Sequence, residues 1–359
     1  MSANRVYHTW LKRIQQIRPQ ERITRLRTFA WLVAGILSSR RVHLSHVASK
    51  MPGAATSVSK ARRLSRFLDN GAIRVREWYE PIARALIAAV VNHGLEVRLL
   101  ADGTKVSFGH QLLMVAIAYR RRAIPLAWTW VRSSRGHSSA LKQLALLSYI
   151  HQLIPPGSRV LIVGDSEFGA VSVLKQLEQW KWQYVMRQKG NTWVKLQDRL
   201  TWLRLESLAQ IGAPPFWSMA ALLSWEHAHP TNLLTYWKAG EKEPWLLATN
   251  LPLARTALRA YERRMWIEEM FGDFKGHGFD LESSHLRHFL RLSRLTLIVA
   301  FLYLWLVAFG SQVIKCGQRR LVDRADRRDL SIFRIGLDTV ERLLANDQPL
   351  PIRFVPYFS

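Results

Sequence analysis

The chain has 359 residues and carries 52 Lys and Arg against 26 Asp and Glu, a formal net charge of +26. Apolar residues make up 48% of it, with 15 Trp, which excludes an intrinsically disordered chain. The single cysteine, Cys316, excludes a disulfide framework and a zinc site of the Cys-x2-Cys type. A charge of this size and one sign predicts a polyanionic partner, so we expect a cytoplasmic, folded protein that handles nucleic acid.

The N-terminal quarter of the chain is the most basic part. Residues 1–90 contain 17 Lys and Arg and only 4 acidic residues, which accounts for half of the net charge. Apolar runs such as 29–37 alternate with basic runs such as 59–66, which indicates helices with one core face and one phosphate-facing side. We therefore predict a basic helical DNA-binding domain over residues 1–92. The first 20 residues lack the apolar segment of a secretory signal and are interpreted as a DNA-contacting helix.

The middle of the chain, residues 93–310, has the pattern of an α/β domain. Short apolar runs predict strands at 97–101, 112–119, 124–131, 160–163, 183–187 and 245–249. Helical patterns lie at 138–153 and 170–180, and a long helix is expected from about residue 253. This order predicts a mixed sheet with flanking helices. The Trp-rich stretch at about 190–243 is expected to be a strand-rich insertion.

The end of the chain contains a long apolar segment and a charged tail. Residues 295–310 include no charge, but a membrane-spanning helix needs about 20 residues, so we expect a buried helix and no membrane contact. A membrane protein built around this segment is the alternative that remains open. Residues 311–359 are interpreted as a C-terminal region that serves dimerisation.

Two aspartates follow apolar strands. Asp102 and Asp165 come at the ends of the strand-like runs 97–101 and 160–163, where ligands bind in α/β folds. An aspartate in this position is also common in a turn or as a helix cap. Neither residue alone therefore identifies a site.

A third carboxylate lies in a more specific context. If residues 261–275 form one helix, Tyr261, Arg264, Glu268 and Lys275 fall within about 60° of one another on one face. An ordinary surface ion pair would explain Arg264 and Glu268 but not the other two residues. Three carboxylates from separate elements suit two Mg²⁺ ions, with Mn²⁺ as a substitute. Basic residues beside them suit DNA phosphates, so the set predicts metal-dependent phosphoryl transfer on DNA.

The spacing Tyr-x2-Arg-x3-Glu-x6-Lys resembles the hallmark of the hairpin-forming, cut-and-paste DDE transposases of bacterial insertion sequences. Asp102 in LLADGT and Asp165 in LIVGDSEFG resemble the two aspartates of that family, and Trp245 in WLLAT resembles a tryptophan that stacks on a flipped base. The resemblance implies a ribonuclease-H-like core. It also implies that Asp102, Asp165 and Glu268 are the catalytic, metal-binding triad.

The same resemblance implies a defined reaction and partner. Two protomers would bind the terminal inverted repeats of a transposon, with Tyr261, Arg264 and Lys275 contacting double-stranded DNA. The ends would be nicked, closed into hairpins, reopened and joined to target DNA, in the bacterial cytoplasm at the nucleoid. Two alternatives remain open, namely a catalytically inactive protein that only binds DNA ends and a related nuclease without strand transfer.

Overall fold

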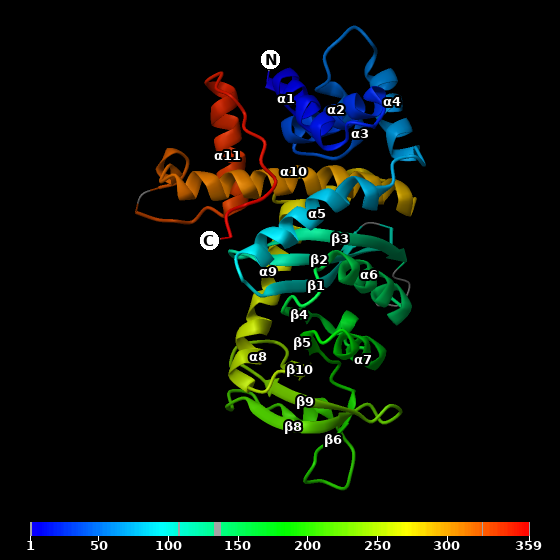
Figure 1. The fold of residues 1–359 in the computed structure, drawn as a ribbon, viewed down its shortest axis with the longest axis vertical. Coiled ribbons are helices and arrows are strands. Elements are labelled where there is room, and N and C mark those ends of the chain that lie inside the picture. The colour runs from blue at the N-terminus through cyan, green and yellow to red at the C-terminus, as the bar shows by residue number, and fades with distance from the viewer. Residues whose placement is uncertain (1, 107, 133–137, 325, 359) are drawn as a thin grey trace. The chain divides into compact units, whose positions relative to one another are not determined.

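The computed structural model describes residues 2–106, 108–132, 138–324 and 326–358 (Figure 1). The chain divides into two compact units. The first, which we call the helical unit, comprises residues 1–93, 105–110 and 269–359. The second, which we call the sheet unit, comprises residues 94–104 and 111–268. Each unit is described by itself.

The helical unit is built from segments at both ends of the chain. Its helices are α1 (Ser2–Ile17), α2 (Ile23–Ser39), α3 (Leu44–Ser49), α4 (Ser57–Asp69), α5 (Val75–Asn92), α10 (Phe289–Lys315) and α11 (Ile332–Ala345). Two short 3-10 turns, η4 (Leu281–Ser284) and η5 (Arg319–Leu321), flank α10. The N-terminal region is helical, as the pattern of apolar and basic runs predicts.

Helix α10 is the central helix of this unit. It contacts α2, α4, α5 and α11, and Phe301 and Trp305 on it meet the ring of Trp10 edge-on. By length and composition α10 could cross a membrane, but 89% of its most apolar window is buried inside the protein. That burial is typical of the core helix of a folded domain, and it agrees with the buried helix that the apolar segment 295–310 predicts. Helix α11 approaches α10 closely because Gly310 and Gly336 face one another at the crossing.

The sheet unit contains one sheet of ten strands, in the order β3-β2-β1-β4-β5-β10-β9-β8-β6-β7 among the described residues. The first five strands along the chain are β1 (Val97–Val106), β2 (His110–Tyr119), β3 (Arg122–Arg132), β4 (Val160–Gly164) and β5 (Gln183–Arg187). The other five are β6 (Trp193–Lys195), β7 (Leu203–Arg204), β8 (Phe216–Leu223), β9 (His229–Tyr236) and β10 (Trp245–Thr249). All six predicted strands are confirmed, and the Trp-rich segment contributes the additional strands β6 to β9.

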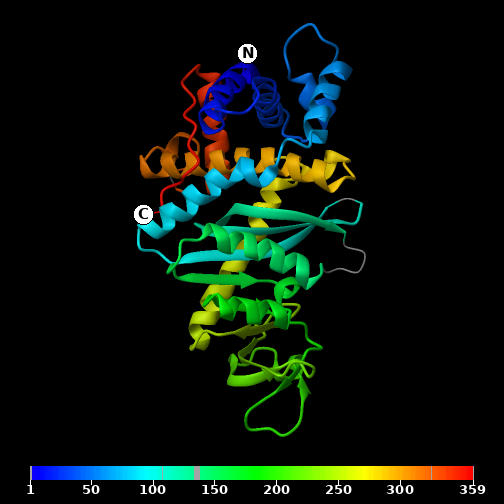
Figure 2. The same ribbon diagram turned by 45° about the vertical axis from the view of Figure 1, so that its right-hand side comes forward.

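The sheet is mixed, as predicted. Strand β4 runs parallel to both β1 and β5, whereas β10 is antiparallel to β5 and to β9. Strands β8 and β9 form a bulged antiparallel pair, so the inserted strands extend the same sheet beyond β10. Helices α6 (Ala140–Leu153) and α7 (Val171–Gln179) contact one another and lie on the same face of the sheet (Figure 2).

The predicted single helix over residues 261–275 is wrong in one respect. The structure has α8 (Ala254–Tyr261), a 3-10 turn η3 (Glu262–Arg264) and then α9 (Met265–Phe274). Three residues per turn replace 3.6 in η3, which rotates the side chains that follow it away from the ideal helical positions. Helix α9 ends at Phe274, so Lys275 lies beyond it. The chain then turns back tightly, and a Cβ atom on Gly278 would lie 2.0 Å from the carbonyl oxygen of Asp273.

Candidate active site

The parallel pairing of β1 and β4 brings the two predicted aspartates side by side. Ala101 is paired with Gly164, and the next residue on each strand is Asp102 or Asp165. The backbone N–H of Asp165 donates a hydrogen bond to the carbonyl oxygen of Ala101 at 3.3 Å. Asp102 lies inside β1, which continues to Val106, whereas Asp165 immediately follows β4.

A glycine lies beside each aspartate, where a neighbouring side chain already fills the space that a Cβ atom would take. A Cβ atom on Gly103 would lie 2.5 Å from the side-chain nitrogen of Gln111. A Cβ atom on Gly164 would lie 2.6 Å from the sulfur of Met186. Contacts this short require neighbouring atoms to move, so the two glycines allow both carboxylates to sit on closely packed backbone.

Asp102 is a buried carboxylate. Only 6% of the residue is exposed, and Oδ1 accepts a hydrogen bond from the backbone N–H of Gly103 at 2.7 Å. Burial raises the pKa of Asp102 to about 7, the guanidinium of Arg264 opposes that rise, and the charges of Asp165 and Glu268 add to it. A positive partner beside the carboxyl of Asp102 therefore favours its ionised form.

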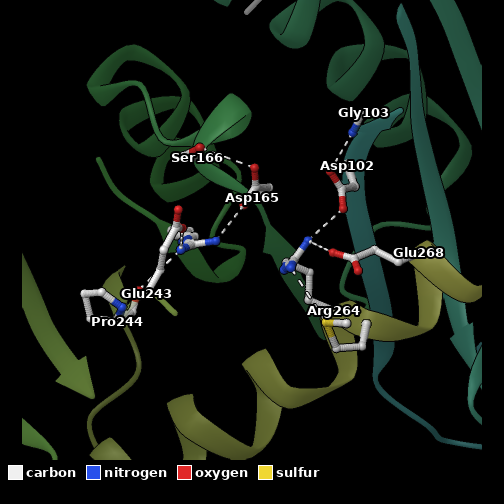
Figure 3. Close-up of polar contacts among 10 residues, drawn as sticks. Asp102, Gly103, Asp165, Ser166, Glu243, Pro244, Arg264 and Glu268 are labelled. Carbon is white, nitrogen blue, oxygen red and sulfur yellow. Dashed lines mark hydrogen bonds and ion pairs between the residues drawn. The ribbon is translucent and has the colours of Figure 1, made fainter. Parts of the chain in front are cut away.

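Arg264 is that partner, and it links Asp102 to the third predicted carboxylate. Its Nη1 atom lies 2.9 Å from Oδ2 of Asp102 and 2.6 Å from Oε1 of Glu268 (Figure 3). Burial alone would lower the pKa of Arg264, but Tyr261, Asp102 and Glu268 together raise it above its ordinary value. Arg264 is thus a permanent cation between two carboxylates that come from β1 and α9.

Asp165 faces a different arginine. Its Oδ1 atom lies 3.9 Å from Nη1 of Arg187, and its Oδ2 atom accepts a hydrogen bond from the hydroxyl of Ser166 at 3.3 Å. Nη2 of Arg187 also pairs with Oε2 of Glu243 at 2.8 Å and donates to the carbonyl oxygen of Pro244 at 3.3 Å. Sequence reasoning did not single out Arg187. The signal was present, because Arg187 ends β5 and β5 is the strand next to β4.

Tyr261 and Trp245 pack against one another in the same unit. Their rings meet edge-on with centroids 5.1 Å apart, and the guanidinium carbon of Arg264 lies 5.6 Å from the centre of the Tyr261 ring. Tyr261 is 2% exposed, its hydroxyl has no hydrogen-bond partner among the described residues, and burial raises its pKa to about 12. Trp245 is half-buried at the start of β10.

Lys275 belongs to the helical unit. Its Nζ atom donates a hydrogen bond to the carbonyl oxygen of Lys105 at 2.7 Å and pairs with Glu282 at 3.1 Å. The structure thus brings Asp102, Arg264 and Glu268 into direct contact and places Asp165, Tyr261 and Trp245 in the same unit as them.

A hollow of about 570 Å³ opens beside Asp165. Its lining includes Arg187, Lys189 and Trp237 together with Glu206 and Glu243. Cationic side chains and an aromatic ring are the groups that contact phosphates and bases in nucleic-acid sites.

The donor atoms of the site suit a hard divalent cation. Three carboxylates from β1, from the end of β4 and from α9 are the oxygen ligands that Mg²⁺ and Mn²⁺ prefer. Among the residues that the structure describes, no group of three or more His, Cys, Asp or Glu side chains is arranged to hold a metal ion. The described arrangement explains this, because Arg264 pairs with Asp102 and Glu268 while Asp165 faces Arg187. The three carboxylates suit a divalent cation in residue type, but Arg264 and Arg187 would have to move away from them for the ion to bind.

A comparison of sequences defines the class of the protein. The profile of a protein family described as transposase DDE domain matches residues 98–305, more than half of the chain. The protein belongs to this family and is therefore a DDE transposase, an enzyme that cuts DNA.

The chain was also compared with solved structures and with curated proteins. Among solved structures, the chain is similar to a piggyBac transposase in a synaptic complex with hairpin DNA, determined by cryo-EM. The identity is 11% and the TM-score 0.45, over 99% of this chain and 83% of that one. A search of curated proteins found no significant match.

Proposed function

We propose that this transposase binds the terminal inverted repeats of a transposon, cuts the DNA there through a hairpin intermediate and joins the freed ends to target DNA. The observation that carries this proposal is the contact of Arg264 with both Asp102 and Glu268, beside Asp165. Three residues of the Tyr-x2-Arg-x3-Glu-x6-Lys motif lie in the sheet unit with the two aspartates. If the motif only stabilised a surface helix, Arg264 would not be expected to contact Asp102, a buried aspartate of a strand.

Each residue of the site has a proposed role. Asp102, Asp165 and Glu268 would hold two Mg²⁺ ions, or Mn²⁺ in their place, which supply Lewis-acid stabilisation of the attacking and leaving oxygens. Arg264 is suited to a backbone phosphate next to the cut, because a guanidinium makes paired hydrogen bonds with phosphate oxygens. The hydroxyl of Tyr261, which has no hydrogen-bond partner among the described residues, would donate to the same stretch of backbone. Lys275 would donate to a neighbouring phosphate, and Trp245 would stack on an unpaired base.

The N-terminal helices are proposed to bind the inverted repeat. On α4 the side chains of Arg62, Arg63 and Arg66 are exposed, and Asp69 at its end is the single acidic residue of the helix. A hollow of about 610 Å³ between α2 and α4 is lined by Arg25, Lys60, Arg63 and Arg66. Around this hollow the cationic side chains outnumber the acidic ones, which are Glu21, paired with Arg25 at 2.7 Å, and Asp69 at the end of α4. Such an excess of positive charge is typical of a surface that neutralises DNA phosphates.

Three further points extend the proposal. The order β3-β2-β1-β4-β5 with parallel β1, β4 and β5 supports a ribonuclease-H-like core. Residues 1–92, 93–310 and 311–359 are proposed as the DNA-binding, catalytic and C-terminal dimerisation regions. Two protomers would act together on two transposon ends, in the bacterial cytoplasm at the nucleoid.

The test is cleavage of a labelled duplex whose sequence is taken from the repeats that flank the coding region. Wild-type protein with Mg²⁺ is compared with an EDTA control and with Asp102→Asn, Asp165→Asn and Glu268→Gln. We expect nicking, then hairpin formation, then joined products, all lost in each variant while binding of the duplex persists. The matched control is Asp198→Asn, which changes an exposed carboxylate of the same unit.

The possible results separate the competing functions. Binding of the duplex without cutting in Mg²⁺ or Mn²⁺ would favour a protein that only occupies the ends. Cutting without joined products would favour a nuclease that lacks strand transfer. Full cleavage by any of the three carboxylate variants would contradict the triad.

A further inference from the structure

One nitrogen atom of Arg264 contacts two carboxylates that come from different elements. Nη1 donates to Oδ2 of Asp102 at 2.9 Å and pairs with Oε1 of Glu268 at 2.6 Å, while only 11% of the arginine side chain is exposed. The guanidinium therefore lies between the two oxygen atoms as a bridging cation, and Figure 3 shows both carboxylates directed at it. Nη2 donates to the sulfur of Met265 at 3.7 Å.

A divalent ion needs the same oxygen atoms. Carboxylate ligands of Mg²⁺ or Mn²⁺ lie about 2.0–2.2 Å from the metal, and a guanidinium within hydrogen-bond distance of those atoms would be repelled by the ion. The two cations would therefore compete for this pair of oxygens. Arg264 in its present position opposes the binding of a metal by Asp102 and Glu268 together.

Arg264 is held in a way that permits a second partner. Its Nε atom is buried without a hydrogen-bond partner among the described residues, and the ring of Tyr261 lies beside the guanidinium, with its own hydroxyl unpaired. A DNA phosphate would give the guanidinium two oxygen acceptors in place of the carboxylates. It would also satisfy donors that the protein leaves unpaired.

From this geometry we infer that Arg264 couples metal binding to DNA binding, because it occupies Asp102 and Glu268 until a DNA phosphate withdraws it. This inference rests on the proposed metal and DNA roles of the site and adds a regulatory step to them. Without DNA the transposase binds divalent ions weakly, so the active site is completed only on its substrate. By reciprocity, divalent ions strengthen the binding of DNA to the same degree.

The inference is tested by metal binding without catalysis. Mn²⁺ binding to the full chain is followed by electron paramagnetic resonance for the wild type, for Arg264→Gln and for Arg259→Gln, an exposed arginine of α8 that serves as the matched control. Without DNA, Arg264→Gln is expected to bind Mn²⁺ about tenfold more tightly than the wild type, which corresponds to a coupling free energy of about 1.4 kcal/mol. Arg259→Gln is expected to bind like the wild type.

A second measurement needs no variant. Mn²⁺ binding to the wild type is compared with and without a short DNA duplex, with the duplex alone as the blank, and about tenfold tighter binding is expected with DNA. In Arg264→Gln the duplex should change Mn²⁺ affinity by much less. This arm keeps the inference testable if the variant does not fold.

The outcomes distinguish this inference from the proposed function. Equal Mn²⁺ affinity of the wild type and Arg264→Gln, or no effect of DNA on the wild type, overturns the coupling and leaves the metal site standing. No Mn²⁺ binding by any of the proteins, with or without DNA, overturns the metal assignment and the coupling with it. Both the metal site and the coupling are supported if Arg264→Gln binds Mn²⁺ more tightly than the wild type and if adding Asp102→Asn to that variant abolishes the binding.

Discussion

The backbone N–H of Asp165 donates a hydrogen bond to the carbonyl oxygen of Ala101, the residue before Asp102. Asp102 and Asp165 are 63 positions apart in the sequence. Their relative position is set by the main-chain hydrogen bonds between the parallel strands β1 and β4 rather than by contacts of their own side chains. Main-chain hydrogen bonds hold such a pair more rigidly than loops would, which matters because phosphoryl transfer depends on positioning. The third carboxylate, Glu268, comes from a helix and is more exposed, with 42% of its side chain accessible.

The hydroxyl of Tyr261 provides the first prediction. It is buried without a partner among the described residues, so removing it by Tyr261→Phe should leave the free energy of unfolding unchanged or raise it by about 1–2 kcal/mol. DNA cutting should nevertheless fall, because the variant lacks the hydroxyl that we propose to contact a DNA phosphate. Chemical denaturation and the cleavage assay measure the two effects on the same preparation. A variant that is less stable and cuts normally would show that the hydroxyl serves the fold.

Arg294 provides a prediction for the helical unit. It is 6% exposed on α10 and donates to the carbonyl oxygens of Leu68 at 2.7 Å and Ile73 at 3.1 Å, which ties the link between α4 and α5 to the central helix. Burial lowers the pKa of Arg294. Arg294→Met should reduce the free energy of unfolding by about 2–4 kcal/mol, because two buried carbonyls lose their donor. Thermal and urea unfolding give the value, with the exposed Arg62→Met as control; equal losses for the two variants would contradict the assignment.

The strands could be predicted from the sequence because each is a short apolar run between turns. Val97, Leu99 and Leu100, for example, are all buried in β1, and burial of this kind leaves a clear pattern. The proximity of Asp102 and Asp165 could also be expected, since both follow apolar runs of strand length, although Asp102 lies inside β1 rather than at its end. Local patterns therefore sufficed for the six predicted strands and for the mixed character of the sheet, while the metal-binding roles of the carboxylates stay a prediction.

Features that depend on distant segments could not be predicted. The 3-10 turn at 262–264 separates α8 from α9, yet its residues have no helix-breaking proline or glycine. The contact of Arg264 with Asp102 crosses 162 positions, whereas its pairing with Glu268 is a local i, i+4 relation that the sequence already suggested. The helical unit likewise joins residues 1–93 to residues 269–359 through packing that no local pattern encodes.

The crossing of α10 and α11 provides a prediction for the C-terminal region. A Cβ atom on Gly336 would lie 1.9 Å from the carbonyl oxygen of Leu306, a backbone atom that cannot turn aside. Gly336→Ala should therefore separate the helices and reduce the free energy of unfolding by about 1–3 kcal/mol. Gly276→Ala is the control, since no atom lies within 4 Å of its Cβ position. If thermal unfolding showed the same midpoint for both variants, the close crossing would be wrong.

His43 provides a prediction of pH dependence. It precedes α3, its ring lies 5.4 Å from that of His285 and 5.6 Å from that of His46, and its Nδ1 atom contacts the hydroxyl of Ser45. Burial lowers the pKa of His43 from 6.5, and His285 and His46 lower it further by repelling a second charge.

The sign of the effect follows from proton linkage. The unfolded chain takes up the His43 proton near pH 6.5, whereas the folded protein takes it up only at lower pH, so the unfolded state binds more protons between the two pKa values. The free energy of unfolding should therefore fall as the pH decreases below 6.5, and His43→Gln should show a shallower fall than the wild type. Urea unfolding across this range measures the difference, with His8→Gln, an exposed histidine of α1, as control. Parallel curves for the wild type and His43→Gln would mean that the three rings do not repel one another in the folded protein.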